Sequence, residues 1–284
     1  MPDLLCVCGA GTMGSGIAEA AAQHGISVIL YDVQPAMLSK ASAHIEAGLQ
    51  QLEAKNRISD AEKKVIFDRI RFTNDLNECR AGIILEAIIE KAEAKSALFA
   101  ELEKINGPGT LFASNSSSLS IKTIAGQTGF PERIIGMHFF NPAPRMKLVE
   151  IVRTSHLSES SIRRIRDLAI QMGKTPVICE DAPGFIVNRV ARPYYLEALR
   201  LIENDVADAE TIDKLTEAAG FKMGPFHLMD LIGNDINYTV SCSLYEALGM
   251  PARLKPSPLQ ALKVEQGNLG RKVGRGFFEY RGVI

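Results

Sequence analysis

The sequence has no tryptophan, few aromatic residues (6%) and no excess of either charge, with 32 Lys plus Arg against 33 Asp plus Glu. Such an even balance does not favour a nucleic-acid-binding protein or a polybasic membrane surface. No apolar run reaches the roughly 18 residues that suggest a membrane-spanning helix. The first residues also lack the basic segment of a secretory signal. We therefore expect neither a nucleic-acid partner nor a membrane partner.

Cysteine is sparse and unpatterned. The five cysteines are an odd number, with no C-x-x-C pair and no Cys/His cluster at zinc-site spacing. We expect reduced thiols in a cytoplasmic protein and no metal site. The 284 residues are 46% hydrophobic and 23% charged, which excludes bulk disorder and allows two ordinary domains.

The chain changes character near residue 183. Before it, a strand, a glycine turn, a helix and a second strand follow one another over residues 4–31, a βαβ unit with parallel strands. After it, apolar residues recur at helical spacing with almost no strand signal. We expect an α/β domain over residues 1–183 and a smaller all-helical domain over residues 184–284. Further strands are expected at residues 82–89, 110–113, 134–140 and 148–152.

The glycine turn has the spacing of a dinucleotide-binding loop, Gly9-Ala10-Gly11-Thr12-Met13-Gly14. In this pattern the glycines permit a tight turn, backbone approach to a pyrophosphate, and close packing of helix on strand. Asp32 ends the second strand 18 residues after Gly14, where it would bind the adenosine ribose and repel a 2′-phosphate. We therefore expect NAD rather than NADP as cofactor. The alternative is a glycine-rich turn with no ligand.

A second candidate site combines a histidine with an acid. His138 lies in one apolar run and Glu150 in the next, and a hairpin about Pro144 would place them opposite each other on one face. Glu150 is costly in an apolar strand unless it is paired. A carboxylate behind an imidazole fixes its tautomer and stabilises imidazolium, as a proton-abstracting base requires. The alternative is a structural histidine.

Several motifs together resemble the short-form L-3-hydroxyacyl-CoA dehydrogenase family, which includes bacterial 3-hydroxybutyryl-CoA enzymes. They are GAGTMG, LEAIIE, ASNSSSLS, GMHFFNPAP, KLVEIV, DAPGFIVNR, MGPFHLMDLIG and GRKVGRGFF, and they extend essentially from end to end of the chain. The resemblance implies a doubly wound Rossmann-type sheet followed by an all-helical domain that dimerises and forms part of the substrate cleft. It also implies NAD as cofactor, an acyl-CoA thioester as substrate and a homodimer.

The resemblance also implies roles for single residues. His138 corresponds to the family base and Glu150 to its partner, while Ser117 and Asn188 would bind the reacting oxygen or the thioester. Two positions depart from the family: Gly48 stands where a serine is usual, and Lys91 where an asparagine is usual. The residues expected near NAD, besides the glycine loop and Asp32, are Glu90, Lys95, Ser117, Asn141 and Lys272, and the residue expected to contact CoA is Lys55.

The function implied is reversible, NAD-dependent oxidation of (S)-3-hydroxyacyl-CoA to 3-oxoacyl-CoA in fatty-acid metabolism, including β-oxidation. A short chain such as 3-hydroxybutyryl-CoA is expected. Arg145 and Arg192 stand where apolar residues are more usual, and one of them would bind the terminal carboxylate of 3-hydroxyadipyl-CoA, a substrate of phenylacetate breakdown. Two solvated arginines are the plainer interpretation.

Two rival functions use the same two-domain plan. One is a dehydrogenase that acts on free 3-hydroxy acids rather than on CoA thioesters. The other is a non-catalytic NAD-binding structural protein, like the lens crystallin that resembles this family. The presence of His138, Glu150, Ser117 and Asn188 argues against the structural protein. Dehydrogenases of free acids resemble a lysine-based mechanism, and the HFFNP motif is not typical of them.

Overall fold

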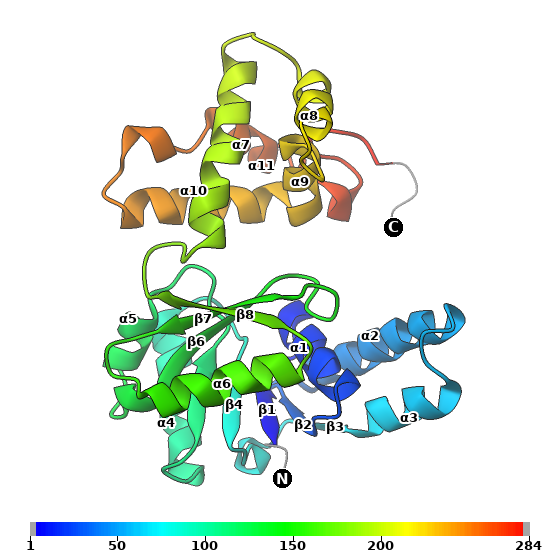
Figure 1. Ribbon diagram of the computed structural model, residues 1–284, viewed down its shortest axis with the longest axis vertical. Coiled ribbons are helices and arrows are strands. Elements are labelled where there is room, and N and C mark those ends of the chain that lie inside the picture. Colours follow the sequence, from blue (N-terminus) through cyan, green and yellow to red (C-terminus); the bar gives the residue numbers. More distant parts are fainter. Residues whose placement is uncertain (1–3, 281–284) are drawn as a thin grey trace. The chain divides into compact units, whose positions relative to one another are not determined.

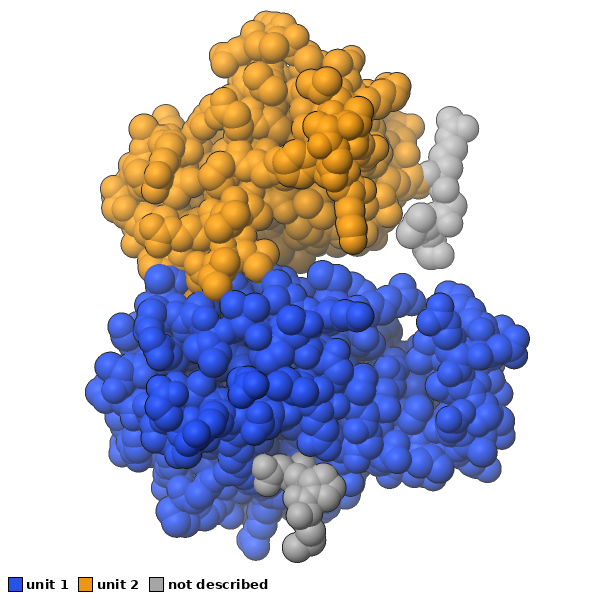
Figure 2. Space-filling model, in the orientation of Figure 1, with its two compact units in different colours: residues 1–182 blue, residues 183–284 orange. Residues whose placement is uncertain are grey.

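The computed structural model describes residues 4–280 and divides the chain into two units (Figures 1 and 2). The first unit ends at Ala182 and the second begins at Pro183, whereas the sequence predicted the division after residue 183. Among the described residues, no helix has the length and apolar character needed to cross a membrane.

The first unit is built on one sheet of eight strands in the order β3-β2-β1-β4-β5-β6-β7-β8. Neighbours from β3 to β6 are parallel, β7 is antiparallel to β6, and β8 is parallel to β7. The expected doubly wound Rossmann-type sheet is confirmed. Its strands are β1 (Leu5–Cys8), β2 (Val28–Tyr31), β3 (Ile70–Thr73), β4 (Ile83–Glu86), β5 (Leu111–Ser114), β6 (Ile134–Phe139), β7 (Leu148–Arg153) and β8 (Thr175–Glu180).

The chain order of the strands changes direction at β1, which lies between β2 and β4. In open α/β sheets the crevice at such a switch point, beyond the carboxyl ends of the strands, is where ligands bind. The glycine loop follows β1, so the fold places it at this edge of the sheet. The helices of this unit are α1 (Thr12–Gln23), α2 (Pro35–Ala54), α3 (Asp60–Asp68), α4 (Ala92–Ile105), α5 (Ile121–Gly126) and α6 (Glu159–Gln171).

Apolar side chains of β1 and β2 pack with α1, α2 and α6 in one core cluster. Leu5 and Val7 belong to this cluster, and the alternation along β1 directs Cys6 and Cys8 to the other face of the sheet. The apolar pattern of the sequence did not reveal β3 and β8, which are the two edge strands. Other elements bury an edge strand less than a central one, and every residue of β8 is exposed or half-buried. Its apolar pattern is therefore weak.

The second unit is helical, as expected, and within the residues that the structure describes its β-structure is limited to isolated bridges of Arg275 with Gly270 and with Glu279. Its core is formed by side chains including Leu196, Leu199, Phe226 and Met229. Gly224 precedes the helix that carries Phe226, and Pro225 occupies its first turn, where a missing N–H costs nothing. The helices are α7 (Val187–Glu203), α8 (Ala209–Ala218), α9 (Pro225–Ile232), α10 (Asn234–Ala247) and α11 (Pro258–Glu265).

Candidate active site

The glycine loop packs too closely for other residues at two of its three glycines. Gly9 has φ +104°, and a Cβ there would lie 2.6 Å from the carbonyl oxygen of Ala87. A Cβ on Gly14 would lie 1.7 Å from the carbonyl oxygen of Gly9. At Gly11, by contrast, an added Cβ would meet no atom within 4 Å. The loop is therefore tight against the sheet and open on the side of Gly11.

Helix α1 begins in this loop with Gly11 as its N-cap residue, and no side chain caps it. The first N–H groups of a helix have no partners within the helix, and they carry the positive end of its dipole. An uncapped N-terminus beside open space is suited to a phosphate group. Thr12 and Met13 form the start of this turn.

Asp32 follows β2 directly and holds the loop in place. Its Oδ2 accepts a hydrogen bond from the Ala10 N–H at 2.8 Å, and its Oδ1 accepts one from the Gln34 N–H at 2.9 Å. Each carboxylate oxygen can accept more than one hydrogen bond, so these contacts leave acceptor capacity for ribose hydroxyls. The loop, the uncapped helix and Asp32 together fit NAD. Residues Gly9–Gly14 would hold its pyrophosphate and Asp32 its adenosine ribose.

His138 and Glu150 are directly opposite each other in the antiparallel β6–β7 pair, so the expected hairpin register is confirmed. The imidazole Nδ1 lies 2.8 Å from Oε2 of Glu150, and both side chains are buried. The ring of Phe140 packs against the imidazole with a centroid separation of 4.6 Å. Asn115 Oδ1 accepts a hydrogen bond from the Phe139 N–H, which ties β6 to the end of β5. The arrangement holds the imidazole in one orientation.

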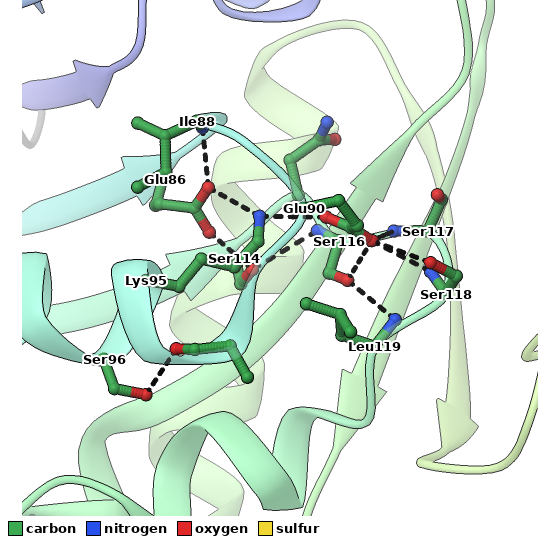
Figure 3. Close-up of polar contacts among 12 residues, drawn as sticks. Glu86, Ile88, Glu90, Lys95, Ser96, Ser114, Ser116, Ser117, Ser118 and Leu119 are labelled. Carbon is green, nitrogen blue, oxygen red and sulfur yellow. Dashed lines mark hydrogen bonds and ion pairs between the residues drawn. The ribbon is translucent and has the colours of Figure 1, made fainter.

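Glu90 organises the serine turn after β5 (Figure 3). Its Oε1 accepts hydrogen bonds from the Ser116 hydroxyl, from the N–H groups of Ser117 and Ser118, and from the Ser118 hydroxyl. Burial alone would raise the pKa of Glu90. The charge of Lys95 and these hydrogen bonds outweigh burial and leave that pKa below its ordinary value. Glu90 therefore fixes the backbone that carries Ser117.

Lys95 lies between two carboxylates and is only 1% exposed. Its Nζ is 2.7 Å from Glu86 Oε1 and 3.1 Å from Glu90 Oε2 (Figure 3). It therefore acts on the site through these two acids. Glu86 was not among the residues expected here, although it is an acid in an apolar strand and the argument applied to Glu150 would have found it. Burial raises the pKa of Glu86 despite the nearby Lys95 charge.

Other expected site residues are dispersed in the first unit. Asn141 is exposed in the loop after β6, and Lys55 is exposed at the C-terminal end of α2. Gly48, the departure on α2, faces α1: a Cβ there would lie 3.2 Å from Glu19 Oε1. Lys91 is exposed just before α4, and nothing in the structure explains its departure from the family.

Two expected site residues belong to the second unit. Asn188 lies in the first turn of α7. Lys272 pairs with Asp235, its Nζ being 2.6 Å from both carboxylate oxygens. The first unit thus brings together His138 with Glu150 and, separately, Ser117 with the Glu90 network, while the helical unit carries Asn188 and Lys272.

Arg192 does not have the surroundings of a solvated residue, and its guanidinium is directed into the helical core. Its Nη1 donates hydrogen bonds to the carbonyl and side-chain oxygens of Asn237 and to the Ser241 hydroxyl, each at 3.0 Å. Its guanidinium also lies over the Tyr195 ring. Burial lowers the pKa of Arg192 to about 10. These contacts show that the expectation of a solvated Arg192 was wrong. They give no support to the alternative, in which Arg192 binds the substrate.

Arg145 is exposed in the loop between β6 and β7. Its positive charge acts on Glu19 of α1. Burial raises the pKa of Glu19 to about 7, and the Arg145 charge offsets only part of that effect. The side chain therefore has a neighbour within the first unit, on the α1 side of the loop.

The fold and the geometry define an NAD-binding oxidoreductase of the Rossmann type. Two family models match the chain: the NAD-binding domain of 3-hydroxyacyl-CoA dehydrogenase over residues 4–182, and the C-terminal domain of the same enzymes over residues 184–280. The chain belongs to the 3-hydroxyacyl-CoA dehydrogenase family. The prediction of an NAD-dependent 3-hydroxyacyl-CoA dehydrogenase is confirmed at this level.

Similar proteins carry two substrate names. The chain is 43% identical over 98% of its length to a 3-hydroxyadipyl-CoA dehydrogenase of Escherichia coli, and it spans 59% of that relative. It is 40% identical over 96% of its length to a probable 3-hydroxybutyryl-CoA dehydrogenase of Deinococcus radiodurans, of which it spans 99%. The crystal structure of (S)-3-hydroxybutyryl-CoA dehydrogenase from Ralstonia eutropha matches with a TM-score of 0.92 at 34% identity, covering 99% of each chain.

Proposed function

We propose that this protein catalyses the reversible oxidation of (S)-3-hydroxyacyl-CoA to 3-oxoacyl-CoA, with His138 as general base and Glu150 as its partner. The observation that carries this proposal is the buried contact between Nδ1 of His138 and Oε2 of Glu150. A neutral imidazole that donates its Nδ1–H to a carboxylate carries its lone pair on Nε2. Nε2 is therefore the atom that takes the proton of the 3-hydroxyl group.

Glu150 contributes in two ways. It selects the tautomer with the proton on Nδ1, and its negative charge stabilises the imidazolium that forms when Nε2 is protonated. In the reducing direction the imidazolium returns the proton to the carbonyl oxygen. NAD, when bound, supplies the acceptor for the hydride from C3. Ser117 and Asn188 hold the reacting oxygen, and the hydrogen bonds from the serine turn to Glu90 fix the first of them.

A short acyl chain is the substrate that we propose, with 3-hydroxybutyryl-CoA as the reference. Arg192 was one of two candidates for binding a second carboxylate, but its Nη1 already donates to oxygens of Asn237 and Ser241. The name of the Escherichia coli relative keeps 3-hydroxyadipyl-CoA as the second candidate. Use of 3-hydroxybutyryl-CoA would place the protein in fatty-acid β-oxidation, and use of 3-hydroxyadipyl-CoA would place it in aromatic breakdown.

The substrate test compares acyl groups at equal NADH concentration. NADH oxidation is followed with acetoacetyl-CoA, with longer 3-oxoacyl-CoAs, with 3-oxoadipyl-CoA and with free acetoacetate. The proposal expects the highest kcat/KM for a short 3-oxoacyl-CoA and no turnover of the free acid. Preference for 3-oxoadipyl-CoA would assign the second candidate. Absence of turnover with every thioester would favour a non-catalytic NAD-binding protein.

We also propose a homodimer formed through the helical unit, in the cytoplasm. Three large apolar side chains at the α9–α10 junction, Leu231, Ile232 and Ile236, are 37–50% exposed. Apolar side chains gathered in this way are typical of an interface. The five cysteines are free, as a reducing compartment favours. Light scattering should give twice the chain mass, and Ile236→Asp should shift it toward the monomer, whereas the exposed-site control Lys214→Asp should not.

A further inference from the structure

Three cysteines that are scattered in the sequence meet in the interior of the first unit. Cys6 and Cys8 lie on the same face of β1, and Cys79 follows the short helix Leu76–Glu78. The three Sγ atoms all lie within 4.8 Å of one another, and those of Cys6 and Cys8 are 3.8 Å apart. All three side chains are fully buried. We call this group the tricysteine cluster.

The backbone holds the tricysteine cluster firmly. Cys6 and Cys8 are in a central strand that is paired on both sides, with β2 and with β4. The Cys79 N–H donates to the carbonyl oxygen of Leu76, and its own carbonyl oxygen accepts from Asn106 Nδ2 at 2.9 Å. The three sulfurs are thus presented by fixed segments rather than by mobile loops.

The spacing of the sulfurs fits one ion bound by three thiolates. With metal–sulfur bonds of about 2.3 Å, three sulfurs in a plane around one ion are about 4.0 Å apart. The Sγ atoms of Cys6 and Cys8 are 3.8 Å apart, which is close to this distance. The Sγ atom of Cys79 is at most 4.8 Å from each of them, so a shift smaller than one bond length would bring it to the same separation.

The donor set selects the class of ion. Thiolates alone favour soft, thiophilic ions, whereas zinc in a structural site takes four ligands. Among the described residues no histidine or carboxylate joins this group, and the complete burial of its three side chains disfavours a water molecule as a fourth ligand.

We propose that the tricysteine cluster is a three-coordinate binding site for a single thiophilic ion. Two kinds of ion share this chemistry. A monovalent ion of the copper(I) and silver(I) class displaces the thiol protons into solvent. Arsenous acid condenses with three thiols, so that three As–S bonds replace three As–O bonds and three waters leave, with no change of oxidation state. The second product is neutral, which is an advantage in a buried site.

The experiment measures ion uptake by the full chain. Cys179→Ser/Cys242→Ser removes the two cysteines outside the cluster, which are only half-buried, and serves as the parent. The parent, the parent with Cys79→Ser and the parent with Cys6→Ala are incubated separately with silver nitrate, arsenite and zinc sulfate. Native mass spectrometry gives the number of ions per chain, and the absorbance of sulfur-to-metal charge transfer reports silver binding. Circular dichroism and thermal unfolding show whether each variant is folded.

The expected result is one silver or one arsenic per chain of the parent, no stable zinc adduct, and affinity at least tenfold lower in both cluster variants. Binding of silver alone would assign the monovalent class. Binding of arsenite, with a mass gain of one arsenic atom minus three hydrogen atoms, would assign the trivalent class. The proposal is overturned if neither ion binds the parent. It is also overturned if folded Cys79→Ser retains the affinity of the parent, or if zinc binds as tightly as the soft ions.

Discussion

Glu150 lies directly across the β6–β7 ladder from His138, and its Oε2 is 2.8 Å from the imidazole Nδ1. An antiparallel pairing one residue out of this register would turn Glu150 to the other face of the sheet. The pairing of two strands therefore sets the tautomer and the orientation of the imidazole. Because both side chains are buried, their contact is screened little by solvent.

Cofactor choice depends on Asp32. Its carboxylate would repel a 2′-phosphate, and the loop that it holds through the Ala10 N–H is the expected site of the pyrophosphate. We expect kcat/KM with NADH to exceed that with NADPH by at least about tenfold, roughly 1.4 kcal/mol. Asp32→Asn should narrow this ratio because it removes the charge and keeps the shape. Equal values for the two cofactors in the unaltered protein would contradict the role of Asp32.

The buried pair of Lys95 and Glu86 should be strongly coupled. Lys95→Met leaves the Glu86 carboxylate buried without its cation, and we expect a loss of about 3–5 kcal/mol in the free energy of unfolding. Adding Glu86→Gln should restore part of this loss, since the uncompensated charge is then gone. Urea unfolding of both single variants and the double variant measures the coupling. Additive effects would show that the two groups are independent.

Glu19 should make stability depend on pH. Burial raises its folded-state pKa from 4.5 to about 7, so the folded protein holds a proton there that the unfolded chain releases. This group's contribution to the free energy of unfolding therefore falls as pH rises from 4.5 to 7. Above pH 7 the protein bears the full cost of burying the ionised Glu19 carboxylate. Glu19→Gln should be more stable than the parent by roughly 1–3 kcal/mol at pH 8, and nearly equal to it at pH 4.5.

A matched control for Glu19→Gln is Glu46→Gln, at an exposed position on the neighbouring helix α2. Thermal or urea unfolding at several pH values compares the two variants. A pH-independent difference between Glu19→Gln and the parent would mean that Glu19 stays ionised in the folded protein.

Arg192 should affect stability rather than acyl selectivity. Arg192→Met removes the three hydrogen bonds that Nη1 donates to Asn237 and Ser241 in the helical core, and we expect a loss of about 1–3 kcal/mol in the free energy of unfolding. The ratio of kcat/KM for acetoacetyl-CoA to that for 3-oxoadipyl-CoA should stay within about threefold of the parent value. Arg163→Met, at an exposed position on α6, is the control. A selective loss with 3-oxoadipyl-CoA in Arg192→Met would restore the dicarboxylate hypothesis.

Local rules were enough for the features encoded by short, regular patterns. The glycine spacing and Asp32 predicted the cofactor loop, and the midpoint between His138 and Glu150 predicted their register, because both depend on near neighbours or on one hairpin. The central strands were visible as apolar runs. The edge strands β3 and β8 were not visible in this way. An edge strand is less buried, so its residues need not be apolar.

Features that depend on contacts between segments distant in the sequence could not be predicted from local patterns. Arg192 was placed on a helix correctly, but only the packing of α7 against α10 shows that its guanidinium is buried. Cys79 is brought to Cys6 and Cys8 by the sheet and not by any spacing motif. Glu86 could have been found by the rule already applied to Glu150, that a lone acid in an apolar strand requires a partner.

The central claim is that His138 moves the substrate proton. The most direct measurement is kcat for acetoacetyl-CoA reduction by His138→Gln, with the dissociation constant for NADH measured by fluorescence on the same sample. Glutamine keeps a polar side chain in the site but cannot transfer the proton, so the account predicts a loss of about 10²–10⁴-fold in kcat with NADH affinity within about twofold of the parent. Glu150→Gln should also lose activity. Turnover by His138→Gln equal to that of the parent would contradict the account.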